Sequence, residues 1–84
     1  MTMLTITVDE KDAEILARAL DTSHTWLLDA WGEAIRQGSS TEPHQEKRKR
    51  ILALSAKLGR PIDDSYRMGH LADFAKKKLE ESYR

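Results

Sequence analysis

The chain has 84 residues, no cysteine, and equal numbers of acidic and basic residues, so its formal net charge is zero. This length suffices for one small domain, which buries only about 60 to 65% of the surface that its unfolded chain exposes, and the lack of cysteine excludes disulfides and thiolate metal sites. No apolar run approaches the roughly 20 residues that span a bilayer, and the first residues lack the basic flank and apolar core of a secretory signal. We therefore expect a cytoplasmic protein that does not associate with membranes.

The first segment alternates apolar and polar side chains over residues 3–8, with Leu4, Ile6 and Val8 on one side. A period of two is typical of a half-buried β-strand. No other segment has this pattern, so the backbone groups of such a strand need a partner from another chain. The alternative is an extended apolar arm that lies across the helices. In the first case the segment predicts self-association, most simply a homodimer, or docking on a target.

Helical spacing of apolar residues predicts a long helix over residues 9–37, with Asp9 as its N-cap. The weak point is the run from Asp21 to Thr25, whose residues have poor helix propensity and could cap a second helix. Residues 9–37 are therefore either one helix or two with a break near 21–25. We favour one helix, because neither Gly nor Pro stands at the break.

A linker is predicted over residues 38–43, where Gly38 ends the first helix and Pro43 suits the first turn of the next. The second helix is expected over 44–58, ended by Gly59 and Pro61. A third is expected over 63–82, capped by Asp63 or Asp64. The predicted fold is thus mainly α, a small helical bundle in a single domain, 1–84, that begins with a short strand or arm over 1–8.

Two glycines, Gly32 and Gly69, fall inside predicted helices, where each costs about 1 kcal/mol relative to Ala. Close approach of a facing helix would explain either residue. A break in the helix would also explain them, and for Gly69 a turn over residues 60–69 is an equal alternative.

Charge is divided between the two halves of the chain. Residues 1–45 carry eight acids and three bases, a net charge of −5, and residues 46–84 carry eleven bases and six acids, a net charge of +5. The densest cluster is the run Lys47, Arg48, Lys49 and Arg50. Its members spread around a helix, and Glu46 can pair with Arg50. We expect a solvated face or a contact with an acidic protein here, with phosphate or nucleic acid as the alternative.

Trp26 and Trp31 stand five positions apart, so on a helix they point roughly 140° away from each other. One of them can therefore lie in the core while the other does not. Two large aromatic side chains in so small a chain can anchor an interface, where Trp is enriched. The simpler interpretation is that both are buried in the core of the chain itself.

The sequence contains no recognisable catalytic or metal-binding motif. His24, His44 and His70 have no metal-ligand spacing, and His70 with Asp73 is typical of a hydrogen-bonded surface pair. No serine lies in a nucleophile elbow, and no glycine-rich phosphate loop is present. We therefore expect no enzyme, no catalytic residue, no metal and no cofactor.

The order of elements, a strand over Leu4 to Val8 and then helical residues from Asp9 to Ile35, resembles the ribbon-helix-helix repressors and antitoxins. The resemblance implies a dimer whose paired strands enter the DNA major groove, with Thr5 and Thr7 facing the bases. The chain departs from that pattern in two places. The strand carries no charged residue, and the run from Asp21 to Thr25 stands where the family has a glycine-containing turn.

The function expected first is a small non-enzymatic module, an inhibitor, adaptor or regulator of phage or bacterial type, that binds another protein stoichiometrically and forms a homodimer. The alternatives are a DNA-binding regulator or antitoxin and a structural subunit of a larger assembly. The residues expected to contact a partner are Leu4, Ile6, Val8, Trp26, Trp31, Lys47, Arg48, Lys49 and Arg50.

Overall fold

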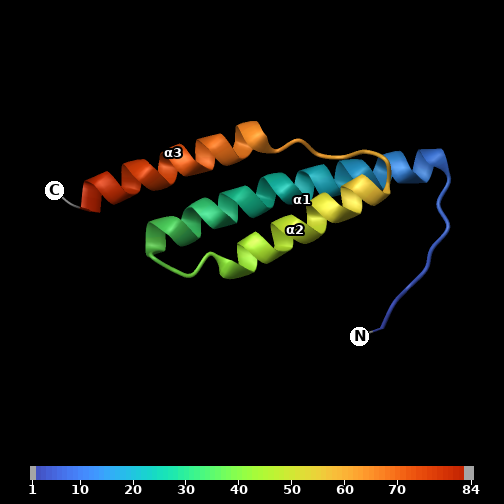
Figure 1. Ribbon diagram of the computed structural model, residues 1–84, viewed down its shortest axis with the longest axis horizontal. Coiled ribbons are helices and arrows are strands. Elements are labelled where there is room, and N and C mark those ends of the chain that lie inside the picture. Colours follow the sequence, from blue (N-terminus) through green and yellow to red (C-terminus); the bar gives the residue numbers. More distant parts are fainter. Residues whose placement is uncertain (1, 83–84) are drawn as a thin grey trace.

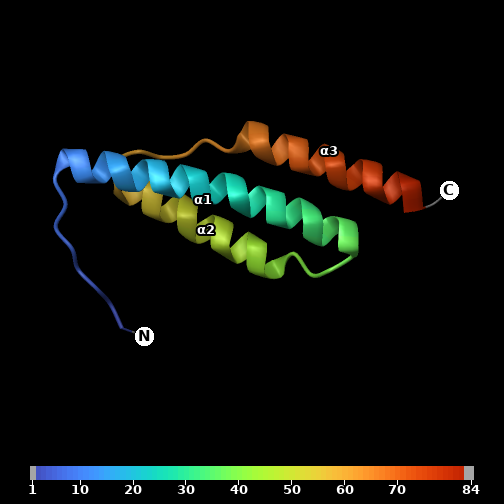
Figure 2. The same cartoon turned by 180° about the vertical axis from the view of Figure 1, so that it is seen from behind.

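The computed structural model describes residues 2–82, which form three helices: α1 (Glu10–Gln37), α2 (Glu42–Lys57) and α3 (Ser65–Ser82) (Figure 1). α1 and α2 are neighbours in an antiparallel hairpin. α3 runs in the same direction as α1, beside its C-terminal half, and reaches past its end (Figures 1 and 2). The predicted fold class, mainly α with one long helix, a linker and two further helices, is confirmed.

Both ends of α1 follow from local capping. The side chain of Asp9 accepts a hydrogen bond of 2.8 Å from the backbone N–H of Asp12, which satisfies one of the free donors of the first turn. At the other end Gly38 adopts a left-handed conformation with φ of 69°, which lets the N–H of Ser39 donate to the carbonyl of Ala34 at 2.9 Å. The helix therefore starts and stops where these residues predict.

α1 continues without a break through residues 21–25, so the single-helix interpretation is correct. The hydroxyl of Thr25 donates to the carbonyl oxygen of Asp21, one turn earlier, at 3.2 Å. The side chains of Asp21 and His24 are engaged in contacts with residues near α3. Two of the polar residues that suggested a turn, Asp21 and His24, therefore serve tertiary contacts instead.

The other helix ends differ slightly from expectation. α2 begins at Glu42, two residues earlier than predicted, with Pro43 in its first turn. α3 begins at Ser65, whose N–H and hydroxyl both donate to Oδ1 of Asp63, at 3.1 and 2.7 Å. The side chain of Asp63 therefore caps the helix, and that of Asp64 does not. The chain is helical through Gly69, so the alternative of a turn there is wrong.

The segment before α1 is an extended arm rather than a strand. Among the described residues 2–82 none is assigned to a strand, because this single chain offers the segment no second strand with which to pair. The arm leaves the start of α1 and bends away from it (Figure 1). Leu4 and Ile6 are 87% and 72% exposed, and Val8 is half-buried.

The three helices form a thin layer, and the chain with its arm measures 54 × 29 × 14 Å along its principal axes. α1 contacts both α2 and α3, whereas α2 and α3 do not touch each other in the described part of the chain. The buried apolar core is correspondingly small and consists of Leu27, Trp31, Ala34 and Ile51. Three polar residues, His24, Ser55 and Asp64, are buried with it.

The layer leaves an unusual amount of surface in contact with water. The accessible surface is 6910 Å², against about 5,100 Å² expected for a compact protein of this mass. The radius of gyration is 15.5 Å, against about 12 Å for a compact domain of this length. None of the described helices combines the length and the apolar character needed to cross a membrane.

Candidate binding surfaces

A partly buried cluster of charged and polar side chains joins the three helices. We call it the polar cluster; its members are Asp21, His24, Arg48, Asp64 and Arg67. Asp21 and His24 belong to α1, Arg48 to α2 and Arg67 to α3, while Asp64 directly precedes α3. The side chain of His24 is completely buried, and that of Asp64 is 7% exposed.

Asp64 is the centre of the polar cluster. Its Oδ2 accepts hydrogen bonds from Nε of Arg48 at 2.6 Å and Nε2 of His24 at 2.9 Å, and its Oδ1 accepts a third from Nη2 of Arg48 at 2.9 Å. The two-pronged contact with Arg48 is the strong, directional form of an ion pair. The Arg48 hydrogen bonds, helped by His24, lower the pKa of Asp64 from 3.8 to about 2, although burial opposes this.

The hydrogen bonds around His24 match a neutral ring. Nη1 of Arg67 lies 3.1 Å from Nδ1 of His24 and can only donate, so Nδ1 must accept and the ring hydrogen sits on Nε2, facing Asp64. Nη2 of Arg67 also pairs with Asp21 at 2.8 Å. Two cations thus face two carboxylates, and the polar cluster is charge-balanced.

The polar cluster holds the three helices together and offers no accessible reactive group. Both ring nitrogens of His24 are occupied and the ring has no exposed surface, so no substrate can reach it in this conformation. Sequence reasoning missed it and assigned Asp64 to capping and Arg48 to a surface cluster. One signal could have found it: His24 occupies an apolar stripe, at helical spacing between Leu20 and Leu27.

The basic cluster predicted from the sequence does not form one surface. Arg48 turns inward to Asp64. Arg50 lies 3.9 Å from Glu46 of the same helix, the pairing expected at this spacing. Lys47 and Lys49 are exposed. They stand two positions apart, whereas residues on one face of a helix stand three or four apart, so their side chains point in different directions. The charge of Arg48 is therefore engaged within the chain, which speaks against the expectation that Arg48 contacts a partner.

The two tryptophans lie in different environments, as their spacing allows. Trp31 is 8% exposed and belongs to the core, where its ring lies 6.3 Å from that of His44. Trp26 is 71% exposed. The interpretation that both are buried is wrong, and the partner-binding expectation for Trp31 loses its support because the side chain is enclosed. Trp26 stays a candidate for an interface.

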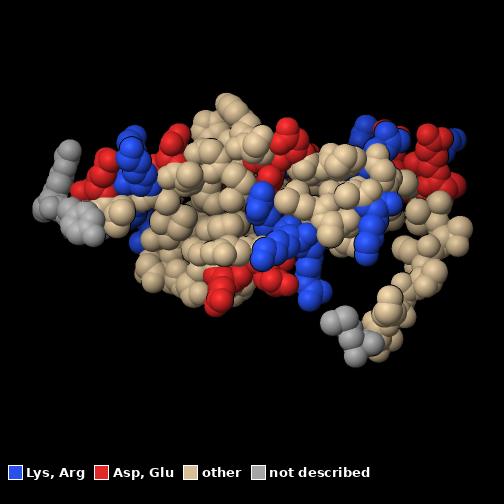
Figure 3. All heavy atoms as spheres, viewed as in Figure 1, with Lys and Arg blue, Asp and Glu red and all other residues tan. Residues whose placement is uncertain are grey.

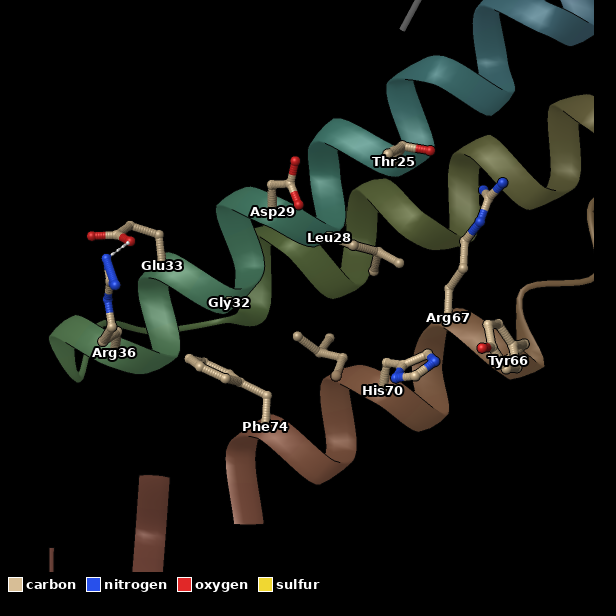
Figure 4. Close-up of a pocket in the computed structure, with 11 residues that line it drawn as sticks. Thr25, Leu28, Asp29, Gly32, Glu33, Arg36, Tyr66, Arg67, His70 and Phe74 are labelled. Atoms are coloured by element: carbon tan, nitrogen blue, oxygen red, sulfur yellow. Dashed lines mark hydrogen bonds and ion pairs between the residues drawn. The ribbon is translucent and has the colours of Figure 1, made fainter. Parts of the chain in front are cut away.

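An open groove of about 460 Å³ lies between α1 and α3 (Figure 4). Its floor is apolar, with Leu28 and Gly32 on α1 facing Leu71 and Phe74 on α3. Charged side chains border it, among them Glu33, which accepts a hydrogen bond of 2.6 Å from Arg36. Nothing in the sequence pattern marked this groove, because its residues are separated by up to about fifty positions in the chain.

A second pair of grooves runs between α1 and α2. The larger, of about 610 Å³, is lined by residues from α1, from the end of α2 and from the arm: Leu4, Thr5, Ile6, Val8, Leu16, Ala19, Leu20, Ser23, Leu54, Lys57 and Leu58. The smaller, of about 380 Å³, continues along the same two helices at Trp26, Pro43 and Lys47. The apolar arm thus lies at the mouth of an apolar groove without being buried in it.

Among residues 2–82, no group of three or more His, Asp, Glu or Cys side chains is arranged to hold a metal ion. His44 packs on Trp31, and His70 contacts the edge of the Tyr66 ring at a centroid distance of 4.5 Å. The three histidines therefore lie in three different environments.

Comparisons of the chain with protein-family models, with curated proteins and with solved structures gave no match. The resemblance to ribbon-helix-helix proteins also fails on structure. That fold needs a turn between its two helices, whereas α1 passes through residues 21–25 as continuous helix.

Proposed function

We propose that this protein is a non-enzymatic binding module that acts by stoichiometric contact with another protein. The observation that carries the proposal is the open layer: the chain buries only four apolar side chains, and with its extended arm included it exposes about 1,800 Å² more than a compact protein of the same mass. Large side chains such as Trp26, Tyr66 and Phe74 are among those exposed, and contiguous exposed apolar patches mark sites of contact with other proteins.

The groove between α1 and α3 is the surface best suited to a partner. Its apolar floor is bordered by charged side chains, the arrangement that receives an amphipathic helix with its apolar side inward. Phe74 is 37% exposed at this floor and Tyr66 is 77% exposed at its edge. Aromatic side chains in such positions are frequent anchors of binding energy. The proposed partner segment is therefore a helix with a narrow apolar stripe.

The proposal is tested by affinity capture with the tagged full chain and two variants of α3. Phe74→Glu places a charge on the groove floor, and Ala72→Glu places the same charge on the exposed opposite side of the same helix. We expect the wild type and Ala72→Glu to retain one protein in a one-to-one ratio and Phe74→Glu to lose it. Circular dichroism checks that both variants keep their helix content.

Two results would contradict the proposal. Equal retention by Phe74→Glu and Ala72→Glu would exclude the groove as the binding site. A failure of the wild type to retain any protein at stoichiometric ratio, from lysate of its native host, would exclude the binding function itself.

A further inference from the structure

We propose that the arm, residues 2–8, closes over the larger groove between α1 and α2 and occupies it in the same molecule. We call this groove the arm groove; its apolar residues on the helices are Leu16, Ala19, Leu20, Leu54 and Leu58. The structure shows the arm in an open position at the mouth of this groove. The proposal adds a closed position, and it does not depend on the groove between α1 and α3.

The arm is already anchored at one end. Val8 is half-buried, whereas residues 2–7 are exposed. Val8 lines the arm groove and also a neighbouring hollow, where the start of α1 meets Leu58 and Gly59 at the end of α2. Closure therefore needs no new contact at this end, because the rest of the arm only has to turn about Val8 and lie along the groove.

The length of the arm matches the length of the groove. An extended chain rises about 3.3 Å per residue, so Ile6 and Leu4 stand about 7 Å apart. Leu16 and Leu20 are one helical turn apart, or about 6 Å. Leu4 lies five residues before Asp9, about 17 Å of extended chain, and Leu20 lies eleven residues after it, about 17 Å of helix. An arm that folds back at Asp9 therefore places its two apolar side chains level with the two leucines of α1.

α2 supplies the second wall of the groove at the same spacing. It runs antiparallel to α1, so Leu58 lies near the start of the groove and Leu54 one turn farther along (Figure 1). Leu54 is 48% exposed. Because side chains alternate along an extended chain, Leu4 and Ile6 can both point into the groove while Thr5 stays in water. The apolar side of the arm thus meets apolar positions that the helices leave uncovered.

An uncharged groove suits an uncharged segment. Among the described residues that line the arm groove, Lys57 alone is charged, and its long stem can cover the arm while its ammonium group stays in water. Residues 2–8 carry no charged side chain, so closure buries no ion. Figure 3 shows the arm as a run of uncharged residues that stands clear of the helices. The charges of the hollow beside Val8 are of both signs, so they neither repel nor steer the arm.

The covalent connection favours the arm over a separate molecule. A short flexible tether gives a segment an effective concentration of about 1 mM at its site. A second copy or another protein at micromolar concentration would therefore have to bind about a thousandfold more tightly than the arm to occupy the groove as often. Closure shields Leu16 and Leu54 from non-specific contacts, which exposed apolar patches otherwise promote.

Thiol protection tests the closed position, because the chain has no cysteine of its own. Ile6→Cys and Thr5→Cys each place one thiol on the arm, on opposite sides of it. The rate of alkylation by iodoacetamide is measured for each folded full-length variant and divided by the rate for the same variant in concentrated urea. We expect the thiol at position 6 to react at least about tenfold more slowly than the thiol at position 5, which corresponds to an arm closed about 90% of the time.

Further changes in the Ile6→Cys background connect the protection to the arm groove. Leu54→Asp places a charge in the groove and should abolish the protection. Ala53→Asp, which is exposed and outside the groove, should leave it unchanged. Leu4→Ser alters only the exposed arm, so it leaves the helices intact and should also abolish the protection. Circular dichroism checks that each variant is folded.

Three results would overturn the inference. The first is equal reactivity at positions 5 and 6, and the second is protection that survives either Leu54→Asp or Leu4→Ser. The third comes from repeating the measurement over about 1 to 100 μM protein, where most weak dimers dissociate measurably. Protection that is independent of concentration supports closure within one molecule, whereas protection that rises with concentration would assign the groove to a second copy.

Discussion

The Nε2 atom of His24 lies 2.9 Å from Oδ2 of Asp64, although forty positions separate the two residues in the chain. This hydrogen bond joins the middle of α1 to the segment that leads into α3. Arg48 brings α2 to the same carboxylate. Because α2 and α3 make no direct contact in the described part of the chain, Asp64 is the point at which all three helices are connected.

Removing the charge of Asp64 should therefore loosen the whole layer. Asp64→Asn leaves Arg48 partly buried without its counter-ion, and loss of one partner from a buried pair costs about 3 kcal/mol. Asp63→Asn is the matched control, because the neighbouring Asp63 is exposed and the amide keeps an acceptor for Ser65. Urea unfolding followed by circular dichroism should show the large loss only at position 64. Equal losses at both positions would contradict the assignment.

Acid should weaken the fold through the same carboxylate. The pKa of Asp64 falls from 3.8 to about 2 on folding, so the folded chain favours the ionised form. The resulting stability is complete above pH 4 and is lost as the pH falls toward 2, by about 2 kcal/mol. The difference in unfolding free energy between wild type and Asp64→Asn should therefore shrink by that amount between pH 5 and pH 2.

Urea titrations at several pH values measure this change. The pKa of Asp63 is also lowered, by its hydrogen bonds from Ser65, but Asp63 is present in both proteins and its contribution cancels. A difference between wild type and Asp64→Asn that stays constant with pH would show that the ion pair does not form in solution.

His24 should be replaceable only by a side chain that keeps a hydrogen-bond donor for Asp64. His24→Leu removes that donor and the acceptor for Arg67, and should lower the unfolding free energy by about 2 kcal/mol. His24→Gln carries both a donor and an acceptor and should lose about half as much. Chemical denaturation of the two variants separates the role of hydrogen bonding from that of packing, since packing alone would favour Leu.

Local sequence signals predicted the helices well, and they predicted the surfaces poorly. Asp9, Gly38 and Gly59 mark helix ends through backbone chemistry that acts over a few residues, and each is found where expected. The polar cluster depends on side chains from three separate elements. Whether Asp64 caps a helix or receives Arg48 is decided by tertiary packing, which a single sequence does not display.

The same limit explains the outcome for the candidate partner residues. The angle between Trp26 and Trp31 follows from helix geometry and correctly separated the two rings. Which of them faces the core depends on where α2 lies. The arm illustrates the opposite case, because its alternating pattern is real and a strand needs a pairing partner that this single chain does not supply.

Truncation of the core residue Ile51 should destabilise the protein, whereas truncation of an equally large exposed residue should have little effect. Ile51 is 5% exposed, so Ile51→Ala leaves a cavity and should cost about 2 to 4 kcal/mol. Ile15 is 66% exposed on α1, and Ile15→Ala should change stability by less than about 0.5 kcal/mol. Thermal and urea unfolding at low protein concentration compares them. A small effect at Ile51 would mean that α2 does not pack on α1 as described.

Replacing either of two glycines inside helices by Ala should stabilise the protein, whereas the same replacement of a glycine at a helix end should destabilise it. A Cβ at Gly32 would lie 3.9 Å from Cε1 of Phe74, an ordinary contact, and a Cβ at Gly69 would meet nothing within 4 Å. Each substitution to Ala should therefore stabilise the protein by about 0.5 to 1 kcal/mol, because Ala loses less backbone entropy in a helix. Gly38→Ala should destabilise it by about 1 kcal/mol, since φ at Gly38 is +69°. Urea unfolding of the three variants measures these signs, and a loss at Gly32 would show that α3 lies closer to α1 than these distances indicate.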